Sequence, residues 1–107
     1  MFARTVTMRL KSNSVAEFNR TIENEIMPIL RKQRGFQDEL TLVTPDGMEA
    51  IGISLWDNKQ NAEAYQREGY AEVQKLIARS IEGNPQVRTY EVPFTSLSKT
   101  ARGTSGA

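Results

Sequence analysis

The sequence predicts an α+β domain in which four strands and two helices follow one another in the order β-α-β-β-α-β. Three features support this prediction: alternating strand patterns near both ends of the domain, two amphipathic helical patterns, and a Pro45-Asp46-Gly47 turn between the central strand patterns. Such a turn joins neighbouring antiparallel strands as a hairpin, and right-handed crossovers place both helices on one face of the sheet. We therefore expect a ferredoxin-like, four-stranded antiparallel sheet with two helices on one face.

The first strand is expected over residues 2–10. Alternation places Phe2, Arg4, Val6, Met8 and Leu10 on one face and the residues between them on the other. A capping box should begin the first helix, with the side chains of Ser14 and Glu17 each bonding the other residue's backbone N–H. Pro28 predicts a kink late in this helix, and Gly35 predicts its end. Its apolar face is expected at Val15, Phe18, Ile22, Ile26, Ile29 and Leu30.

The other strands are expected over residues 36–44, 48–56 and 86–94. Asp57 or Asn58 should cap the second helix, which breaks near Gly69 and ends at Gly83-Asn84-Pro85. Residues 1–95 then form one domain. Residues 96–107 lack apolar periodicity and are expected to be a mobile C-terminal tail.

Alternation divides the sheet's side chains between two faces. The face toward the helices is expected to carry bulky aliphatic residues, namely Val6, Met8, Leu10, Leu40, Leu42, Ile51, Ile53 and Leu55. The opposite face is expected to carry Ala3, Thr5, Thr7, Thr41, Val43, Ala50, Gly52, Ser54, Trp56, Tyr90 and Val92. A solvated sheet face usually carries Lys, Glu and Arg. The smaller and aromatic residues here predict a homodimer whose two sheets meet on this face and form a barrel.

The composition excludes several kinds of chemistry. The chain contains no Cys and no His, which excludes disulfides, thiolate nucleophiles, Ser-His-Asp triads, His-ligated metals and haem with an axial His. Lys and Arg number 14 and Asp and Glu 13, so the net charge of +1 predicts no attraction to nucleic acid. No apolar run reaches the about 18 residues of a membrane span, and no signal peptide is visible. We expect a cytoplasmic protein without a metal or a membrane partner.

Three stretches resemble a known family. They are Met27-Pro28-Ile29-Leu30-Arg31-Lys32-Gln33-Arg34-Gly35-Phe36, Ile53-Ser54-Leu55-Trp56-Asp57 and Ala64-Tyr65. Together they resemble the antibiotic biosynthesis monooxygenase-like family of the dimeric α+β barrel superfamily, over residues 2–94. In that family a proline lies late in the first helix, Gly-Phe enters the second strand, and a Trp beside an acidic residue closes the third.

The resemblance implies a dimeric barrel and, as one activity among several on this fold, oxygenation without a cofactor. In such enzymes the anion of a polyphenol, anthrone or quinol passes an electron to oxygen. Haem-degrading relatives use a His of the second helix and an Asn of the first strand. Gln74 and Met8 occupy or adjoin those positions here, which argues against haem, and we expect no cofactor.

A pocket is expected between the sheet and the helices. The candidate catalytic residues are Tyr65, Tyr70 and Arg4, because phenols and a guanidinium can bind an oxyanion. The candidate ligand-binding residues are Trp56, Met8 and Gln74. The tyrosines could also be ordinary core residues, Trp56 could anchor the dimer interface, and Arg4 could pair with Asp38 or reach the end of the sheet.

Two functions therefore remain open. The first is a cofactor-independent monooxygenase acting on a small aromatic, quinol or polyketide-like compound. The second is a non-catalytic dimeric barrel that binds a small molecule or serves as a stress-linked accessory. An exposed Arg4, with no enclosed cavity against either tyrosine, would remove the physical basis of the first.

Overall fold

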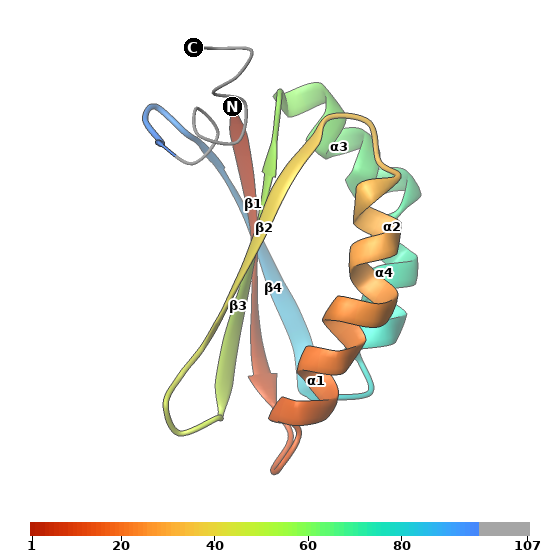
Figure 1. Cartoon of the computed structure of the whole chain (residues 1–107), viewed down its shortest axis with the longest axis vertical. Helices are drawn as coiled ribbons and strands as arrows, with labels where there is room; N and C mark the ends of the chain where they lie inside the picture. The colour runs from red at the N-terminus through yellow and green to blue at the C-terminus, as the bar shows by residue number, and fades with distance from the viewer. Residues whose placement is uncertain (97–107) are drawn as a thin grey trace.

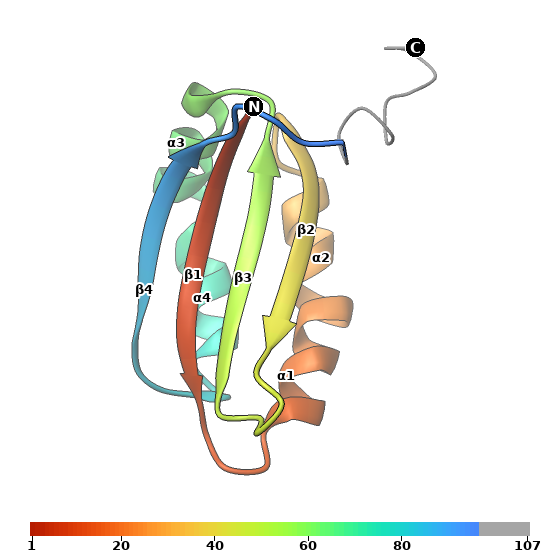
Figure 2. The ribbon, with the colours of Figure 1, turned by 90° about the vertical axis from the view of Figure 1, so that its left-hand side faces the viewer.

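The computed structural model describes residues 1–96 and has the predicted order of elements. The strands and helices are β1 (Phe2–Leu10), α1 (Val15–Thr21), the π-helix η1 (Ile22–Ile26), α2 (Met27–Arg31), β2 (Phe36–Val43), β3 (Glu49–Trp56), α3 (Lys59–Glu68), α4 (Tyr70–Ile77) and β4 (Ile81–Glu91). The four antiparallel strands are ordered β2-β3-β1-β4. All helices cover one face of the sheet (Figure 1), and the other face is open (Figure 2). The predicted fold class is confirmed.

Pro28 explains the irregularity of the first helical segment. α1, η1 and α2 follow one another without a gap, and Pro28 lies in the first turn of α2. A proline inside a helix removes a backbone donor and clashes with the carbonyl four residues earlier. The wider π-helical turn directly before it accommodates both effects. The predicted disturbance therefore takes the form of a π-helix, and Ile22 and Ile26 lie within it.

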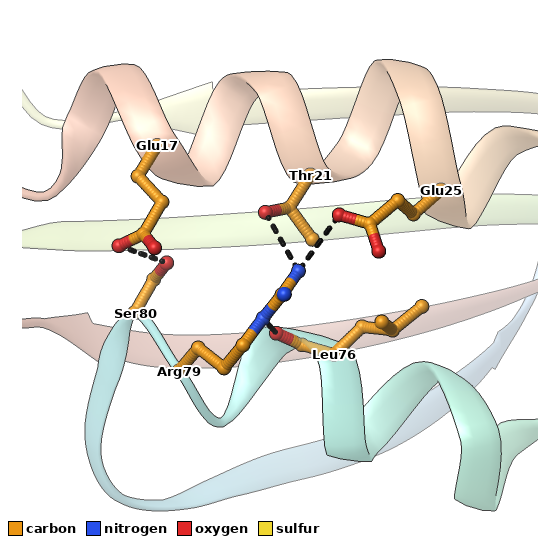
Figure 3. A network of polar contacts seen from close by, with 6 residues as sticks. All are labelled: Glu17, Thr21, Glu25, Leu76, Arg79 and Ser80. Carbon is orange, nitrogen blue, oxygen red and sulfur yellow. Dashed lines mark hydrogen bonds and ion pairs between the residues drawn. The ribbon is translucent and has the colours of Figure 1, made fainter.

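The predicted capping box is wrong. Ser14 has φ −106° and ψ 1°, outside the extended conformation of most N-caps, and its side chain makes no cap hydrogen bond. The Ser14 hydroxyl instead donates to the Ser12 carbonyl at 3.4 Å. The Glu17 carboxylate accepts a hydrogen bond from the Ser80 hydroxyl, 3.4 Å away, which joins α1 to the segment before β4 (Figure 3).

Arg79 makes the main polar connection between the two helical segments. Its guanidinium donates to Thr21 Oγ1 at 3.4 Å and forms an ion pair with Glu25 Oε2 at 2.8 Å (Figure 3). Exposed ion pairs contribute about 0–1 kcal/mol, and both side chains here are nearly half exposed. The network therefore links the two segments but contributes little to stability.

The second helical segment begins and breaks as predicted. Asn58 caps α3 by accepting a hydrogen bond from the Asn61 backbone N–H at 2.8 Å. The segment breaks at Gly69, between α3 and α4. A Cβ at Gly69 would lie 2.9 Å from Tyr65 Cδ1. The lack of a side chain there allows Tyr65 to lie against the break. No helix within residues 1–96 is long and apolar enough to cross a membrane.

The predicted helix end at Gly83-Asn84-Pro85 is wrong. α4 ends at Ile77, and β4 already begins at Ile81. The pairing of β4 with β1 shifts between Thr7 and Arg9, and Gly83 has φ +69°. A glycine in the left-handed region is typical of a bulge that bends a strand. The Gly-Asn-Pro signal therefore marks a distortion within the strand.

The predicted sheet faces are correct for β1 and wrong for β2 and β3. Val6 pairs with Gly52, and Gly52 pairs with Thr41, so these three residues share one face. Val6 packs on the core beneath the helices. Hence the residues facing the helices include Glu39, Thr41, Val43, Ala50, Gly52, Ser54 and Trp56. The open face carries Leu40, Leu42, Ile51, Ile53 and Leu55 beside Thr5, Thr7 and Tyr90.

Packing explains why the bulky aliphatics lie on the open face. The helices already contribute large buried side chains to the core, among them Phe18, Leu30 and Tyr65. Close packing leaves room for only small residues at positions 50, 52 and 54 of β3 beneath them. A register shift between Phe36 and Asp38 also places Phe36 opposite Trp56 and on its face, while Leu40 lies on the other face.

Gly35 and Gly83 allow a direct test of the junction between α2 and β2. Both have positive φ, +82° and +69°, which disfavours any other residue. A Cβ at Gly35 would also clash with the Asp57 carboxylate and lie 2.8 Å from Asn61 Cβ, whereas a Cβ at Gly83 meets nothing within 4 Å. We expect G83A to lower the free energy of unfolding by about 1–2 kcal/mol and G35A by about 3 kcal/mol or more. Chemical denaturation measures both, and equal losses would contradict the clash.

Candidate functional site

Two neighbouring cross-strand rows form the floor of the candidate site. Arg4 on β1 pairs with Ser54 on β3, and Ser54 pairs with Glu39 on β2. The next row is Val6–Gly52–Thr41. Because directly opposite residues share a face, a cation and a carboxylate lie on the covered side, two strands apart. The small side chains of Ser54 and Gly52 lie between them.

A cavity of about 50 Å³ lies between this floor and the helices. Its polar groups come from Arg4, Glu39, Ser54, Tyr65 and Tyr70. The rest of its lining is apolar or lacks a side chain: Val6, Met8, Phe18, Ile22, Ile26, Leu30, Gly52, Val73 and Ile77. The pocket expected between sheet and helices is therefore present, and its walls are mainly hydrophobic with a few convergent polar groups, as in typical small-molecule sites.

Arg4 is the central charge of this cavity. It is 2% exposed and lies over the rings of Tyr65 and Tyr70, at 4.9 and 4.6 Å from their centroids. Its guanidinium donates to the side-chain oxygen of Gln66. Within residues 1–96 no carboxylate lies within 4.0 Å of it, so the alternative of an Asp38 pair is wrong. Burial lowers the pKa of Arg4, and the two tyrosines partly oppose that shift.

The two tyrosines bracket the helix break beside Arg4. Tyr65 is buried, stacks on Trp56 with centroids 5.0 Å apart, and meets Tyr70 edge-on at 6.0 Å. Burial raises the pKa of both phenols, and Arg4 partly opposes the rise. Tyr70 is 5% exposed, and its hydroxyl has no hydrogen-bond partner within residues 1–96. A buried polar atom without a partner is uncommon and costs about 1–3 kcal/mol.

Glu39 is the functional candidate that the sequence analysis missed. It lines the cavity, and burial raises the pKa of its carboxyl group, an effect that Thr41 partly opposes. The Thr41 hydroxyl lies 2.9 and 3.1 Å from its two carboxylate oxygens. The alternation of β2 contained the signal, because Glu39, Thr41 and Val43 share a face. The assignment of Leu40 and Leu42 to the core concealed it.

Of the other predicted site residues, Met8 lines the cavity, whereas Trp56 and Gln74 do not. Trp56 is fully buried, and its indole Nε1 donates to Ser54 Oγ at 2.9 Å. Trp56 stacks on Tyr65 but does not line the cavity. Because it is buried and pairs with Phe2 on the covered side of β1, its predicted place on the open face is wrong. Gln74 is exposed and does not line the cavity. It is not positioned to bind a ligand there.

A second hollow of about 100 Å³ adjoins the other side of Arg4. Its lining combines Phe2, Arg4, Lys59, Ala62, Glu63, Gln66 and Thr89. Arg4 lines both hollows, whereas Gln66 lines only this one. The Arg4–Gln66 hydrogen bond therefore lies where the two approach each other. No cluster of three or more acidic residues that could hold a metal occurs within residues 1–96.

Solved structures share this architecture. A monooxygenase from Streptomyces coelicolor in complex with nanaomycin D has a TM-score of 0.70 at 17% identity, with 88% of each chain covered. The chain has the fold of the antibiotic biosynthesis monooxygenases. SnoaB, a cofactor-independent oxygenase from Streptomyces nogalater, has a TM-score of 0.69 at 14% identity, covering 88% of this chain and 94% of its own. The resemblance predicted from the sequence is confirmed in the fold.

The same fold also occurs where no reaction is assigned. A protein of unknown function from Nitrosomonas europaea has a TM-score of 0.67 at 13% identity, covering 88% of this chain and 90% of its own. No protein-family model and no curated protein sequence matches the chain. At these identities the shared fold does not determine a reaction, so the argument for function depends on the cavity.

The unpartnered Tyr70 hydroxyl predicts an unusual response to mutation. Replacing Tyr70 with Phe removes a buried polar atom without breaking a hydrogen bond, so we expect Y70F to raise the free energy of unfolding by about 1 kcal/mol. Y65F is the control, because the Tyr65 hydroxyl interacts with the buried Arg4 guanidinium, which lies over its ring, and we expect it to destabilise the fold. Urea denaturation of both variants measures this difference. A loss of stability in Y70F as large as that in Y65F would contradict it.

Proposed function

We propose that the protein is a cofactor-independent monooxygenase acting on a small aromatic, quinol or polyketide-like compound. The observation that carries the proposal is the buried Arg4, which has no carboxylate partner within residues 1–96 and lies over the ring of Tyr70, whose hydroxyl has no hydrogen-bond partner there. A buried cation without a counter-charge is costly, and an anionic ligand would remove that cost. A phenolate or enolate has the charge and the aromatic surface that such a site suits.

Once the substrate is ionised, the proposed chemistry needs binding and charge stabilisation from the protein. Arg4 and the Tyr70 hydroxyl would bind the substrate oxyanion, and a nearby cation favours the ionised form of a phenol or enol. The apolar walls would exclude water from the activated anion. The anion would then pass one electron to O₂, the substrate radical and superoxide would combine to a peroxide, and loss of water from this peroxide would leave one oxygen atom on the product. Tyr65 would orient Arg4 through the contact between the guanidinium and its ring.

The size of the cavity adds a condition. At about 50 Å³ it is smaller than the about 150 Å³ cavity that accommodates benzene in another protein. An aromatic ligand therefore requires the walls to move. Gln66 is exposed and bonds Arg4 at the neighbouring hollow. Replacing that hydrogen bond by one to the ligand would join the two hollows into a larger space.

We expect the wild-type protein to consume O₂ with at least one member of a panel of quinols and anthrones. R4M should lower kcat/KM by about 10²-fold or more, the typical loss on removing one oxyanion-stabilising group. R67M is the matched control, because Arg67 lies exposed on α3. An oxygen electrode measures the rates. No uptake by folded wild-type protein across the panel would favour the non-catalytic alternative, and an unimpaired R4M would contradict the role of Arg4.

We also propose a homodimer formed through the open face of the sheet (Figure 2). That face is more apolar than predicted, because Leu40 and Leu42 are 49% and 46% exposed and Tyr90 is 46% exposed. Ile51, Ile53 and Leu55 lie between them and β1. Contiguous exposed apolar area of this kind is typical of association surfaces. A second copy presents the same self-complementary face, as a twofold dimer requires.

Light scattering at micromolar concentration should give twice the monomer mass. I53R should give a folded monomer, because Ile53 lies on β3 between Thr5 and Leu40, in the middle of the face. V87R is the matched control, because Val87 is exposed on β4 but pairs with Val6 on the helix side. A monomeric wild type, or loss of the dimer in V87R alone, would contradict the proposed interface.

A further inference from the structure

We propose that Glu39 is the catalytic base that removes the proton from the substrate's hydroxyl group. This inference rests on the proposed monooxygenase function and assigns a role to the carboxylate that faces Arg4 across the sheet. Glu39 is the only acidic side chain that lines the cavity among residues 1–96. With no His or Cys in the chain, a carboxylate is the simplest base at neutral pH.

The register places the base and the cation at the two ends of one row. Arg4, Ser54 and Glu39 lie side by side on β1, β3 and β2, so the backbones of Arg4 and Glu39 are about 10 Å apart, twice the strand spacing. Only the small Ser54 side chain stands between them. A flat ring lying across the row would direct one oxygen toward Glu39 and another toward Arg4. This favours a substrate with oxygens on opposite sides of an aromatic ring.

The floor next to Glu39 is shaped to leave its carboxylate free. A Cβ at Gly52 would lie 3.5 Å from Glu39 Oε2 and 3.8 Å from Met8 Cε. A Cβ alone would therefore make ordinary contact, but a side chain larger than a methyl group at position 52 would occupy the space into which the carboxylate reaches. Thr41, in the same row as Gly52, donates its hydroxyl to this carboxylate. The carboxylate is thus held by one neighbour and left open toward the cavity.

The surroundings of Glu39 make its carboxylate a stronger base than an exposed one. Burial raises the pKa of Glu39, the Thr41 hydrogen bond lowers it, and Asp38 on the opposite face raises it. The ionisable groups lining the cavity with it are Arg4 from β1, Tyr65 from α3 and Tyr70 from α4. A carboxylate with a raised pKa holds a proton more tightly and is a stronger base than one in water.

The proton transfer balances without another reactant. The O–H bond of the substrate breaks, a new O–H bond forms on a Glu39 carboxylate oxygen, and the electron pair stays on the substrate. The resulting negative charge spreads over the ring toward Arg4 and Tyr70. O₂ is the oxidant in the step that follows, and Glu39 retains the proton meanwhile.

A binding experiment tests this transfer without turnover. The probe is 4-nitrophenol, whose phenolate absorbs at longer wavelength than the neutral phenol, mixed with protein at a pH where the free probe is neutral. Wild-type protein should produce the phenolate spectrum without releasing a proton to a weakly buffered solution, because Glu39 retains it. E39Q should produce that spectrum only with release of about one proton per probe bound. E72Q, on the exposed side of α4, should behave as wild type.

Two outcomes of that experiment would overturn the role of Glu39. One is equal proton release by wild type and E39Q, and the other is a bound probe that stays neutral in wild type. Failure of the variant to fold is not expected, because the amide has nearly the same shape. Glu39 has a raised pKa in the folded state, so its ionised form opposes folding, and this penalty grows as pH rises through that pKa. E39Q should therefore be at least as stable as wild type at neutral pH.

Kinetics provide an independent readout for the same residue. E39Q should lower kcat/KM for a quinol by about 10²-fold or more below the substrate's own pKa, the usual contribution of a general base. The loss should shrink as pH rises through that pKa, because the substrate then arrives already ionised. A pH-independent loss would indicate a structural role and overturn the proposal. If wild type consumes no O₂ with any substrate, the monooxygenase proposal fails, and the 4-nitrophenol result still decides the role of Glu39.

Discussion

The small side chains on the covered face of β3 are the constraint on which the rest of the molecule depends. Ala50, Gly52 and Ser54 face helices that carry Phe18, Leu30 and Tyr65 into the core. Because protein interiors are close-packed, bulk on one layer requires small residues on the other. The fit is incomplete near Gly52, and the cavity remains there. The same alternation directs Ile51, Ile53 and Leu55 outward, so one feature accounts for both the cavity and the apolar open face.

The polar groups of the cavity are poorly satisfied in the free protein. Arg4 has five N–H donors but lies among aromatic rings, and in the described part of the chain it donates a hydrogen bond to Gln66. The Tyr70 hydroxyl has no partner within residues 1–96. Burial also raises the pKa of Glu39. Groups in such states reduce the stability of a fold and are characteristic of sites organised for a ligand.

The contrast between Trp56 and Glu39 shows how the site could be misjudged from the chain. Trp56 is the more conspicuous residue, yet it is fully buried and supports Tyr65 from behind. Glu39 lies in an unremarkable stretch, yet it lines the cavity opposite Arg4. A carboxylate becomes a candidate base only through burial and its neighbours. Neither the burial of Glu39 nor its neighbours can be known before the faces of β2 are assigned.

The amino-acid sequence by itself determined the order of elements, the hairpin at Pro45-Asp46-Gly47, a helix cap at Asp57 or Asn58 and a break near Glu68-Gly69. These depend on local patterns and turn chemistry, which a single chain contains. The alternation of β1 also placed Arg4 on the helix side of the sheet, and helical spacing placed Tyr65 and Tyr70 on the apolar side of the second helix. The described part of the chain ends at Ser96, so the predicted tail over residues 96–107 lies almost wholly outside it.

Only the tertiary structure decided which faces of β2 and β3 meet the helices. Both faces of β3 are free of charged residues over positions 50–56, so alternation defines two sets of residues without saying which is covered. The choice depends on the volume that the helices bring, on the strand register and on the bulge after Phe36. These are long-range properties, and they alone brought Glu39 into the cavity and left Leu40 and Leu42 on the open face.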